Sequence, residues 1–170
     1  MKICVAMPVW NEAEEIVEFI TKLEGSMHKL YPIFIVIDDC STDGTLDALT
    51  SIDPTRFNVI VERNAINLGH GPNTLRGLRR ALYEHPDAVT AIDGDGQFRG
   101  IDVAKCLSEF LATGSDVLEG VRRRRDEIWF RQILTHLTKV LVWLQCGQFP
   151  SDANALLRIY KPETLESLLN

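Results

Sequence analysis

The sequence predicts an α/β fold, a doubly wound and mostly parallel sheet with helices on both faces. Six short apolar runs alternate with amphipathic segments along the 170 residues. Strands that face water on one side alternate polar and apolar residues, whereas these runs are apolar throughout, so both faces of the sheet should be covered. The chain has the length of one domain, and its 45% hydrophobic and 25% charged residues are ordinary for a globular protein.

The strands are predicted from short runs rich in β-branched residues, such as IFIVID. The expected strands span residues 3–7, 33–38, 58–62, 88–93, 116–120 and 155–160. The helices are predicted from apolar residues at helical spacing between these runs. The expected helices span residues 12–29, 43–51, 72–85, 101–113, 128–145 and 162–169.

Residues with a preference for helix starts precede three of these segments. Asn11 stands before the first helix, and Pro72 stands in the first turn of the third. Ser41, Thr42 and Asp43 precede the second helix, and we assign all three to capping.

Charge and cysteine usage restrict the class of protein. The net charge of −6 argues against broad nucleic-acid binding. The four cysteines lie far apart with no CxxC pair, as expected for reduced thiols in a cytosolic protein. We expect no signal peptide and no membrane span, because Met1 leads directly into the first strand and no apolar stretch reaches about 20 residues. We therefore expect a cytoplasmic location.

A candidate metal site follows the fourth strand, in the stretch AIDGDGQF. Alternating residues beyond a strand end can point the same way, so Asp93, Asp95 and Gln97 could converge on Mg²⁺ or Mn²⁺ through hard oxygen ligands. Gly94 and Gly96 would leave space for a ligand beside the backbone. The alternative is a polar turn with solvated acids, because Asp-Gly steps are common in turns.

Two other strand ends carry candidate ligand contacts, since ligands bind outside the carboxyl ends of strands in such sheets. Asp39 follows Asp38 at the end of the second strand, where a carboxylate can hold a ribose hydroxyl or the edge of a base. Trp10 follows the first strand and either forms one wall of a nucleobase pocket or packs in the core. Gly69 and Gly71 precede the third helix, whose free N–H groups could receive a phosphate.

A basic run interrupts the acidic background of the chain. Five of its twelve arginines fall between residues 122 and 131. Guanidinium groups donate in a planar fork that suits phosphate. An apolar helical stripe follows, so the segment 122–145 is either a basic amphipathic element on an anionic membrane surface or a core helix behind a solvated basic turn.

Taken in order along nearly the whole chain, these motifs resemble those of the family 2 glycosyltransferases with the GT-A fold. The matching segments are PVWNEAEEI, VIDDCSTDGT, NLGHGPNTLRGLRRAL, DGDGQF, GVRRRRD and DANALLRIY. Within that family the chain looks most like the dolichol-phosphate mannose synthase branch, which transfers a sugar from a nucleotide donor to a polyprenyl phosphate. The resemblance implies one GT-A domain over 1–170, with a donor half at 1–97 and an acceptor half at 98–170.

The resemblance also implies roles for the matching residues. Those implied to bind the nucleotide-sugar donor are Pro8, Trp10, Glu12, Asp39, Gly69, Asp93 and Gly94. Those implied to hold Mg²⁺ or Mn²⁺ are Asp93, Asp95 and Gln97. Those implied to bind the acceptor phosphate are Arg122, Arg131, Thr135 and Arg158. Those with a catalytic role would be Asp93, Asp95, Arg131 and Asp152. Trp10 stands where the family usually has Tyr, Thr135 where Ser is more usual, and His70 where Lys is frequent.

The implied reaction is a metal-dependent, inverting transfer from a UDP-, GDP- or dTDP-linked sugar to a lipid phosphate. Because a lipid phosphate is already largely ionised near neutral pH, it needs positioning by arginines more than a strong base. A sugar hydroxyl acceptor would instead need a base, for which Asp152 is the candidate. Two other classes stay open: a non-catalytic nucleotide-sugar-binding module, and a phosphatase of the HAD type, whose aspartate pair normally follows the first strand and not the fourth.

Overall fold

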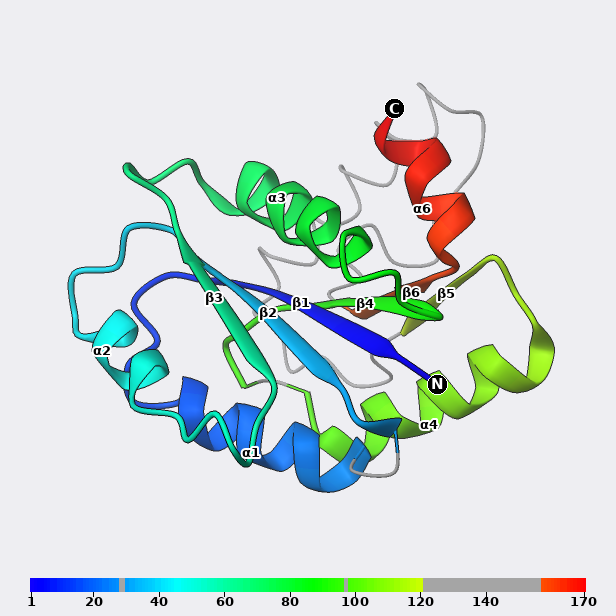
Figure 1. Cartoon of the computed structure of the whole chain (residues 1–170), viewed down its shortest axis with the longest axis horizontal. Helices are drawn as coiled ribbons and strands as arrows, with labels where there is room; N and C mark the ends of the chain where they lie inside the picture. The colour runs from blue at the N-terminus through cyan, green and yellow to red at the C-terminus, as the bar shows by residue number, and fades with distance from the viewer. Residues whose placement is uncertain (28–29, 97, 121–156) are drawn as a thin grey trace, which may run out of the picture.

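The protein is described from a computed structural model, which covers residues 1–27, 30–96, 98–120 and 157–170. Its six strands form one sheet in the order β3-β2-β1-β4-β6-β5 (Figure 1). The strands are β1 (Ile3–Val9), β2 (Ile33–Asp38), β3 (Val59–Arg63), β4 (Ala88–Ile92), β5 (Val117–Gly120) and β6 (Leu157–Tyr160). The helices are α1 (Ile16–Met27), α2 (Thr45–Thr50), α3 (His70–Leu82), α4 (Gly100–Thr113) and α6 (Pro162–Leu169).

The sheet is mostly parallel, as predicted. β1 pairs in parallel with β2 on one side and with β4 on the other, and β2 pairs in parallel with the edge strand β3. β6 lies between β4 and β5 and runs antiparallel to both. The carboxyl ends of β1, β2, β3 and β4 therefore lie at one edge of the sheet, where ligands bind in folds of this kind.

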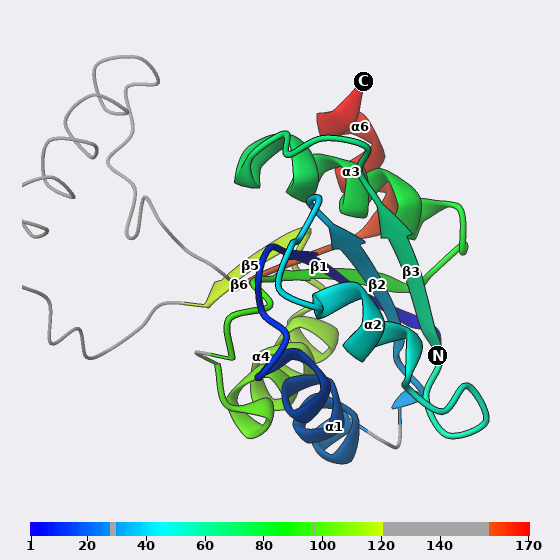
Figure 2. The ribbon, with the colours of Figure 1, turned by 90° about the vertical axis from the view of Figure 1, so that its left-hand side faces the viewer.

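Helices cover both faces of the sheet. Figure 1 and Figure 2 show α1, α2 and α4 on one face and α3 with α6 on the other. Side chains alternate along each strand, so Met7 and Ile92 join the apolar cluster beneath the first group, while Ala6 and Ala91 join the cluster beneath the second. The central strands β1, β2 and β4 are buried along their whole length, which explains why their sequences are almost entirely apolar and do not alternate.

The first helix begins later than predicted. α1 starts at Ile16 and not at residue 12. Asn11 takes a left-handed backbone conformation, with φ of 56°, which asparagine tolerates better than most residues. Its side-chain oxygen accepts the Thr42 N–H at 2.9 Å, and its own N–H donates to Ser41 Oγ at 2.9 Å. The predicted capping roles of Asn11, Ser41 and Thr42 are therefore wrong, because these residues join two loops instead.

Asp43 makes the predicted contact with the start of α2 and also binds the β1–α1 loop. One carboxylate oxygen accepts the N–H of Thr45, the first residue of α2, at 3.0 Å, while the other accepts the Ala13 N–H from the β1–α1 loop at 3.1 Å. The hydroxyl of Thr45 accepts the Glu12 N–H at 2.8 Å. The β1–α1 loop is thus fixed against the β2–α2 loop, which sets the position of the Glu12 side chain.

Within the part of the chain that the structure describes, no helix is long and apolar enough to cross a membrane. The predicted helix 128–145 lies outside the described residues. Cys4, Cys40 and Cys106 are free thiols, and only Cys4 is fully buried. Burial raises the pKa of the Cys4 thiol to about 11, so it stays protonated at neutral pH.

Candidate functional site

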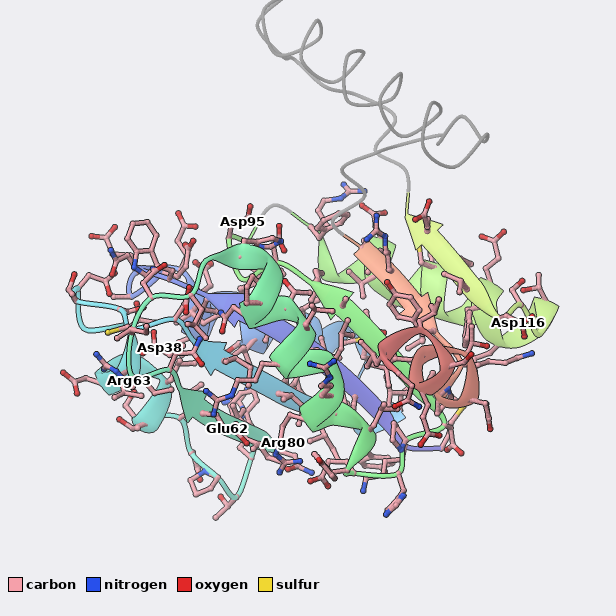
Figure 3. The ribbon with its side chains drawn as sticks, turned by 90° about the horizontal axis from the view of Figure 1, so that it is seen from above. Asp38, Glu62, Arg63, Arg80, Asp95 and Asp116 are labelled. Carbon is pink, nitrogen blue, oxygen red and sulfur yellow. The ribbon has the colours of Figure 1, made fainter. Side chains whose placement is uncertain are left out.

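A cavity of about 740 Å³ opens at the edge of the sheet where β1, β2 and β4 end. Figure 3 shows Asp38 and Asp95 at this end of the molecule. The lining comes from the end of β1, from the β1–α1, β2–α2, β3–α3 and β4–α4 loops, and from the first turn of α3. The described residues that line it are Pro8, Val9, Trp10, Glu12, Asp39, Cys40, Thr42, Asn67, Gly69, His70, Asn73, Asp93, Gly94 and Asp95.

The cavity gathers all seven residues that the sequence assigns to the donor, together with Asp95. Trp10 is 55% exposed at this site, so the alternative that it packs in the core is wrong. Sequence reasoning did not select Asn67, Asn73 or Cys40. Asn73 could have been noticed in the sequence because it lies inside a predicted helix. Asparagine is a weak helix former, so its presence there suggests a specific hydrogen bond.

Asp39 is almost completely enclosed, with only 2% of its surface exposed. One carboxylate oxygen accepts the Leu68 N–H at 2.9 Å and the Asn64 side-chain amide at 2.6 Å. The other oxygen accepts the Gly69 N–H at 2.8 Å. Burial would raise the pKa of Asp39, but these three hydrogen bonds outweigh it and lower the pKa below the usual value. Asp39 therefore holds the β3–α3 loop while it lines the cavity.

The glycine loop differs from the predicted phosphate cradle in one respect. α3 starts at His70, earlier than expected, with Gly69 as its N-cap. Gly69 has φ of 85° and ψ of 166°, a combination that essentially only glycine adopts. Its N–H donates to Asp39 and so is not available to a phosphate. The conformation required by this turn explains the glycine, and a phosphate would have to use the next N–H groups of the first helical turn.

Close packing against β1 requires a glycine at position 94, which also lines the cavity. A Cβ at this position would lie 2.5 Å from Val9 Cγ1 and 3.3 Å from the Pro8 carbonyl oxygen. The Gly94 N–H also donates to that carbonyl at 3.4 Å. Close packing therefore requires a glycine here, and the role of Gly94 beside a ligand stays a prediction. Gly96 has φ of 69°, so the turn conformation accounts for it as well.

Negative charge accumulates in the cavity. Glu12, Asp39, Asp93 and Asp95 all line it, and the described lining contains no lysine or arginine. Partial burial raises the pKa of the Glu12 carboxyl, and the neighbouring carboxylates, first among them that of Asp95, raise it further. The only described lining residue that can carry a positive charge is His70, whose Nε2 lies 3.6 Å from Asp93 Oδ1.

Replacing Glu12 with glutamine should raise the melting temperature of the ligand-free protein at neutral pH. The raised pKa means that the ionised carboxyl is disfavoured in the folded state. This destabilisation is absent below the pKa of an unfolded glutamate, about 4.3, and grows as the pH rises through the higher folded pKa. Solvent screens the repulsion, so we expect a gain of about 1–3 °C. Differential scanning calorimetry at acid and neutral pH measures it, and an equal shift at both pH values would contradict the assignment.

The donor atoms at this site suit a hard divalent cation. Asp93 and Asp95 supply carboxylate oxygens in a cavity whose described lining contains no lysine or arginine. Gln97, the third expected ligand, lies outside the described residues. Among the residues that are described, no three His, Cys, Asp or Glu side chains are grouped closely enough to hold a metal ion by themselves. The chemistry of the two aspartates fits Mg²⁺ or Mn²⁺, which complete their coordination with waters and phosphates.

The residues expected to bind the acceptor are mostly outside the described part of the chain. This applies to Arg122, Arg131, Thr135 and Asp152. Arg158 is described, on β6, where its Nε lies 3.0 Å from Glu119 Oε1 of the neighbouring strand β5. Arg158 does not line the cavity, and its charge is at present compensated by Glu119.

The fold and the position of the cavity define the class of protein. The structure resembles a mannosyltransferase from Pyrobaculum calidifontis, solved with GDP-Man and Mn²⁺, with a TM-score of 0.66 and 22% identity over 98% of this chain and 46% of that one. It also resembles mannosyl-3-phosphoglycerate synthase from Rubrobacter xylanophilus, with a TM-score of 0.71 and 19% identity over 96% of this chain and 54% of that one. At these identities the likeness shows the fold, which is the GT-A fold of glycosyltransferases.

The sequence is specific enough to give the family. The model of glycosyl transferase family 2 matches residues 4–169, and the chain belongs to this family. A similar relative is the undecaprenyl-phosphate 4-deoxy-4-formamido-L-arabinose transferase of Serratia proteamaculans, which is 27% identical over 99% of this chain and 52% of its own length. The chain thus spans about half the length of the arabinose transferases that it matches.

Proposed function

We propose that this chain forms the nucleotide-sugar-binding part of a glycosyltransferase that transfers a sugar to a polyprenyl phosphate. The observation that carries the proposal is the convergence of the seven expected donor residues, from four separate segments, on one cavity. Membership of glycosyl transferase family 2 supports the reaction class. The acceptor class is supported by the undecaprenyl phosphate in the name of the arabinose transferases. Residues 1–97 would form the donor half and residues 98–170 the acceptor half.

The charge of the cavity supports a requirement for a divalent cation. A nucleoside diphosphate is an anion, and four carboxylates in the lining would repel it. Mg²⁺ or Mn²⁺ held by Asp93, Asp95 and Gln97 would offset the charge of these two aspartates and stabilise the diphosphate that leaves. Burial raises the pKa of Glu12 most, and the nearby carboxylates of this cavity raise it further.

The other lining residues divide the tasks of binding. Trp10 is exposed at the rim, where its indole ring can stack on a nucleobase. Asp39 is held rigidly, and the oxygen that accepts only the Gly69 N–H keeps capacity for a base N–H or a ribose hydroxyl. The start of α3 presents the positive end of a helix to the cavity, beside His70.

For the acceptor, we propose that Arg122, Arg131, Thr135 and Arg158 position a lipid phosphate. An ionised phosphate attacks without a strong base, so the protein mainly has to align it with the sugar. Arg158 would then exchange its partner Glu119 for the phosphate. The segment 122–145 would contact the cytoplasmic face of an anionic membrane, where such a lipid is found. If the acceptor were a sugar hydroxyl, Asp152 would serve as the base.

A thermal-shift screen of UDP-, GDP- and dTDP-linked sugars, each with and without Mn²⁺, tests this function. We expect one nucleotide to raise the melting temperature only when the cation is present, since a ligand at about 100 times its Kd stabilises by about 2.7 kcal/mol. Addition of a chelator should remove the shift. Product formation with a polyprenyl phosphate then distinguishes an enzyme from a module that only binds, and no shift with any donor would contradict the proposal.

A further inference from the structure

A buried polar network lies behind the cavity and connects Asp39 with α3. Its central residue is Asn64, which directly follows β3 and is 2% exposed. The Asn64 amide nitrogen donates to Asp39 Oδ1 at 2.6 Å and to Asn73 Oδ1 at 2.9 Å. Asn73, 1% exposed, donates in turn to the carbonyl oxygen of Ile37 at 2.9 Å. Both N–H groups of the Asn64 amide are therefore used inside the protein.

The network continues outward to an ion-pair cluster on the edge of the molecule. The side-chain oxygen of Asn64 accepts a hydrogen bond from Arg76 Nη1. Arg76 Nη2 lies 2.7 Å from one oxygen of Glu62, and Arg80 Nε lies 2.9 Å from the other. Figure 3 shows Glu62 on β3 beside Arg80 of α3. The Asn64 side chain is thus fixed from both sides, by Arg76 outside and by Asp39 and Asn73 inside.

We propose that Asn64 is a positioning residue of the donor site, which holds the Asp39 carboxylate in the orientation that forms the cavity wall at residues 67–69. The inference rests on the proposed function and adds to it a residue that does not line the cavity. Asp39 must receive the Leu68 and Gly69 N–H groups at once, which fixes the rotation of its carboxylate. Asn64 supplies the third donor, so the wall is formed before a ligand arrives and little ordering is needed on binding.

The chemistry of asparagine makes this role specific. Its amide offers two donors to Asp39 and Asn73 and one acceptor to Arg76, which no hydrocarbon side chain of similar size can do. Aspartate has the same shape and keeps the acceptor for Arg76, but an ionised carboxylate has no N–H and would face Asp39 with a second negative charge. Asn64→Asp therefore removes the positioning contact with the least change in volume.

The test is the binding of UDP and GDP, with Mn²⁺, measured by isothermal titration calorimetry. At about pH 7.5 Asn64→Asp should raise the Kd of the preferred nucleotide at least about tenfold over wild type. At about pH 5.5 the two facing carboxyls should share a proton, as coupled acids do, and the O–H at position 64 again donates to Asp39. The ratio of the Kd of Asn64→Asp to the Kd of wild type should then be at least about threefold smaller than at the higher pH. The charged groups facing position 64 are Asp39, Arg76 and the Arg76 partner Glu62.

Two further variants separate positioning from stability. Leu107→Ala removes a fully buried side chain in α4, on the opposite face of the sheet from α3, and should lower the melting temperature without changing the Kd by more than about twofold. Arg76→Gln removes the guanidinium that donates to Asn64 and pairs with Glu62, leaves the contacts of Asn64 with Asp39 and Asn73 in place, and should raise the Kd about threefold. A Kd within twofold of wild type for both network variants, or a loss that is the same at both pH values, overturns the inference. Absence of nucleotide binding by the wild-type protein instead overturns the proposed function.

Discussion

Replacing Asp39 with asparagine is expected to lower the free energy of unfolding by about 2–4 kcal/mol at neutral pH. Three donors converge on the Asp39 carboxylate, from the Leu68 and Gly69 backbones and from the Asn64 side chain. An asparagine at this position has one acceptor oxygen, and its NH₂ group would face at least one of these donors. Because the site is 2% exposed, water cannot replace the lost hydrogen bond. The same change should weaken nucleotide binding at least about tenfold, because the cavity wall at Gly69 loses its support.

The pH dependence of this effect has a definite sign. The folded-state pKa of Asp39 is below that of an unfolded aspartate. The carboxylate therefore contributes its full stabilisation above about pH 3.9, and the contribution is lost as the pH falls through the lower, folded pKa. Denaturant unfolding of wild type and variant should show a difference that is constant near neutral pH and shrinks in acid. A difference that does not depend on pH would show that the charge of Asp39 is not the stabilising feature.

Asp53→Asn is the matched control for this experiment. Asp53 also accepts two hydrogen bonds within a loop, from the backbone and hydroxyl of Thr55, but it is exposed and lies away from the cavity. Water replaces the lost contacts there, so stability and nucleotide binding should change little. An equal effect at both positions would mean that the loss of any loop carboxylate is enough.

Replacing Asp93 or Asp95 with asparagine should abolish the cation-dependent binding of nucleotide and reduce sugar transfer on the order of 10³-fold, equivalent to about 4 kcal/mol of transition-state stabilisation. Each change removes an anionic oxygen from the expected metal site. Either change should also lower the pKa of Glu12, because Asp95 and Asp93 are among the carboxylates that raise it. A variant that loses Mn²⁺ binding but has a higher melting temperature than wild type would show that the aspartate serves the metal site and does not stabilise the fold.

Titration of Mn²⁺ followed by electron paramagnetic resonance measures the first effect, and a transfer assay with Mg²⁺ or Mn²⁺ measures the second. Asp102→Asn provides the control, since Asp102 lies in the first turn of α4, close in sequence, but is paired at the surface with Arg99 at 2.9 Å. The control should bind Mn²⁺ and nucleotide as wild type does. Undiminished Mn²⁺-dependent binding by both site variants would exclude Asp93 and Asp95 as the metal ligands.

The candidate donor residues could be found in the sequence because they follow strands. Asp39 and Asp93 come directly after apolar runs, and parallel strands bring such positions to the same edge of the sheet. Asn64 and Asn73 could not be found in the same way. Asn64 reads as an ordinary loop residue, and only the approach of β3, the β2 end and α3 buries it among hydrogen-bonding partners.

The capping assignments failed for a related reason. Serine and threonine side chains often accept hydrogen bonds from the backbone N–H groups at the start of a helix. Because a helix follows Ser41 and Thr42 in the sequence, its first N–H groups were the expected donors. In the folded protein, however, the β1–α1 loop lies against them and Asn11 is the partner of both. A local pattern gives the hydrogen-bonding capacity of a residue, while the packing of loops distant in sequence decides which group uses it.

The sequence by itself determined the strands, the covered sheet and the residues at the ends of its strands. Hydrophobic periodicity and the position of a residue after a strand are local properties, so they can be recognised without knowing which segments pack together. The sequence also carried the motifs of glycosyl transferase family 2. Only the tertiary structure decided that Gly94 is required by contact with Val9, that β6 enters the sheet antiparallel, and that Asn64 supports Asp39. These features depend on distances between segments far apart in the chain, which are set by how the helices and strands pack.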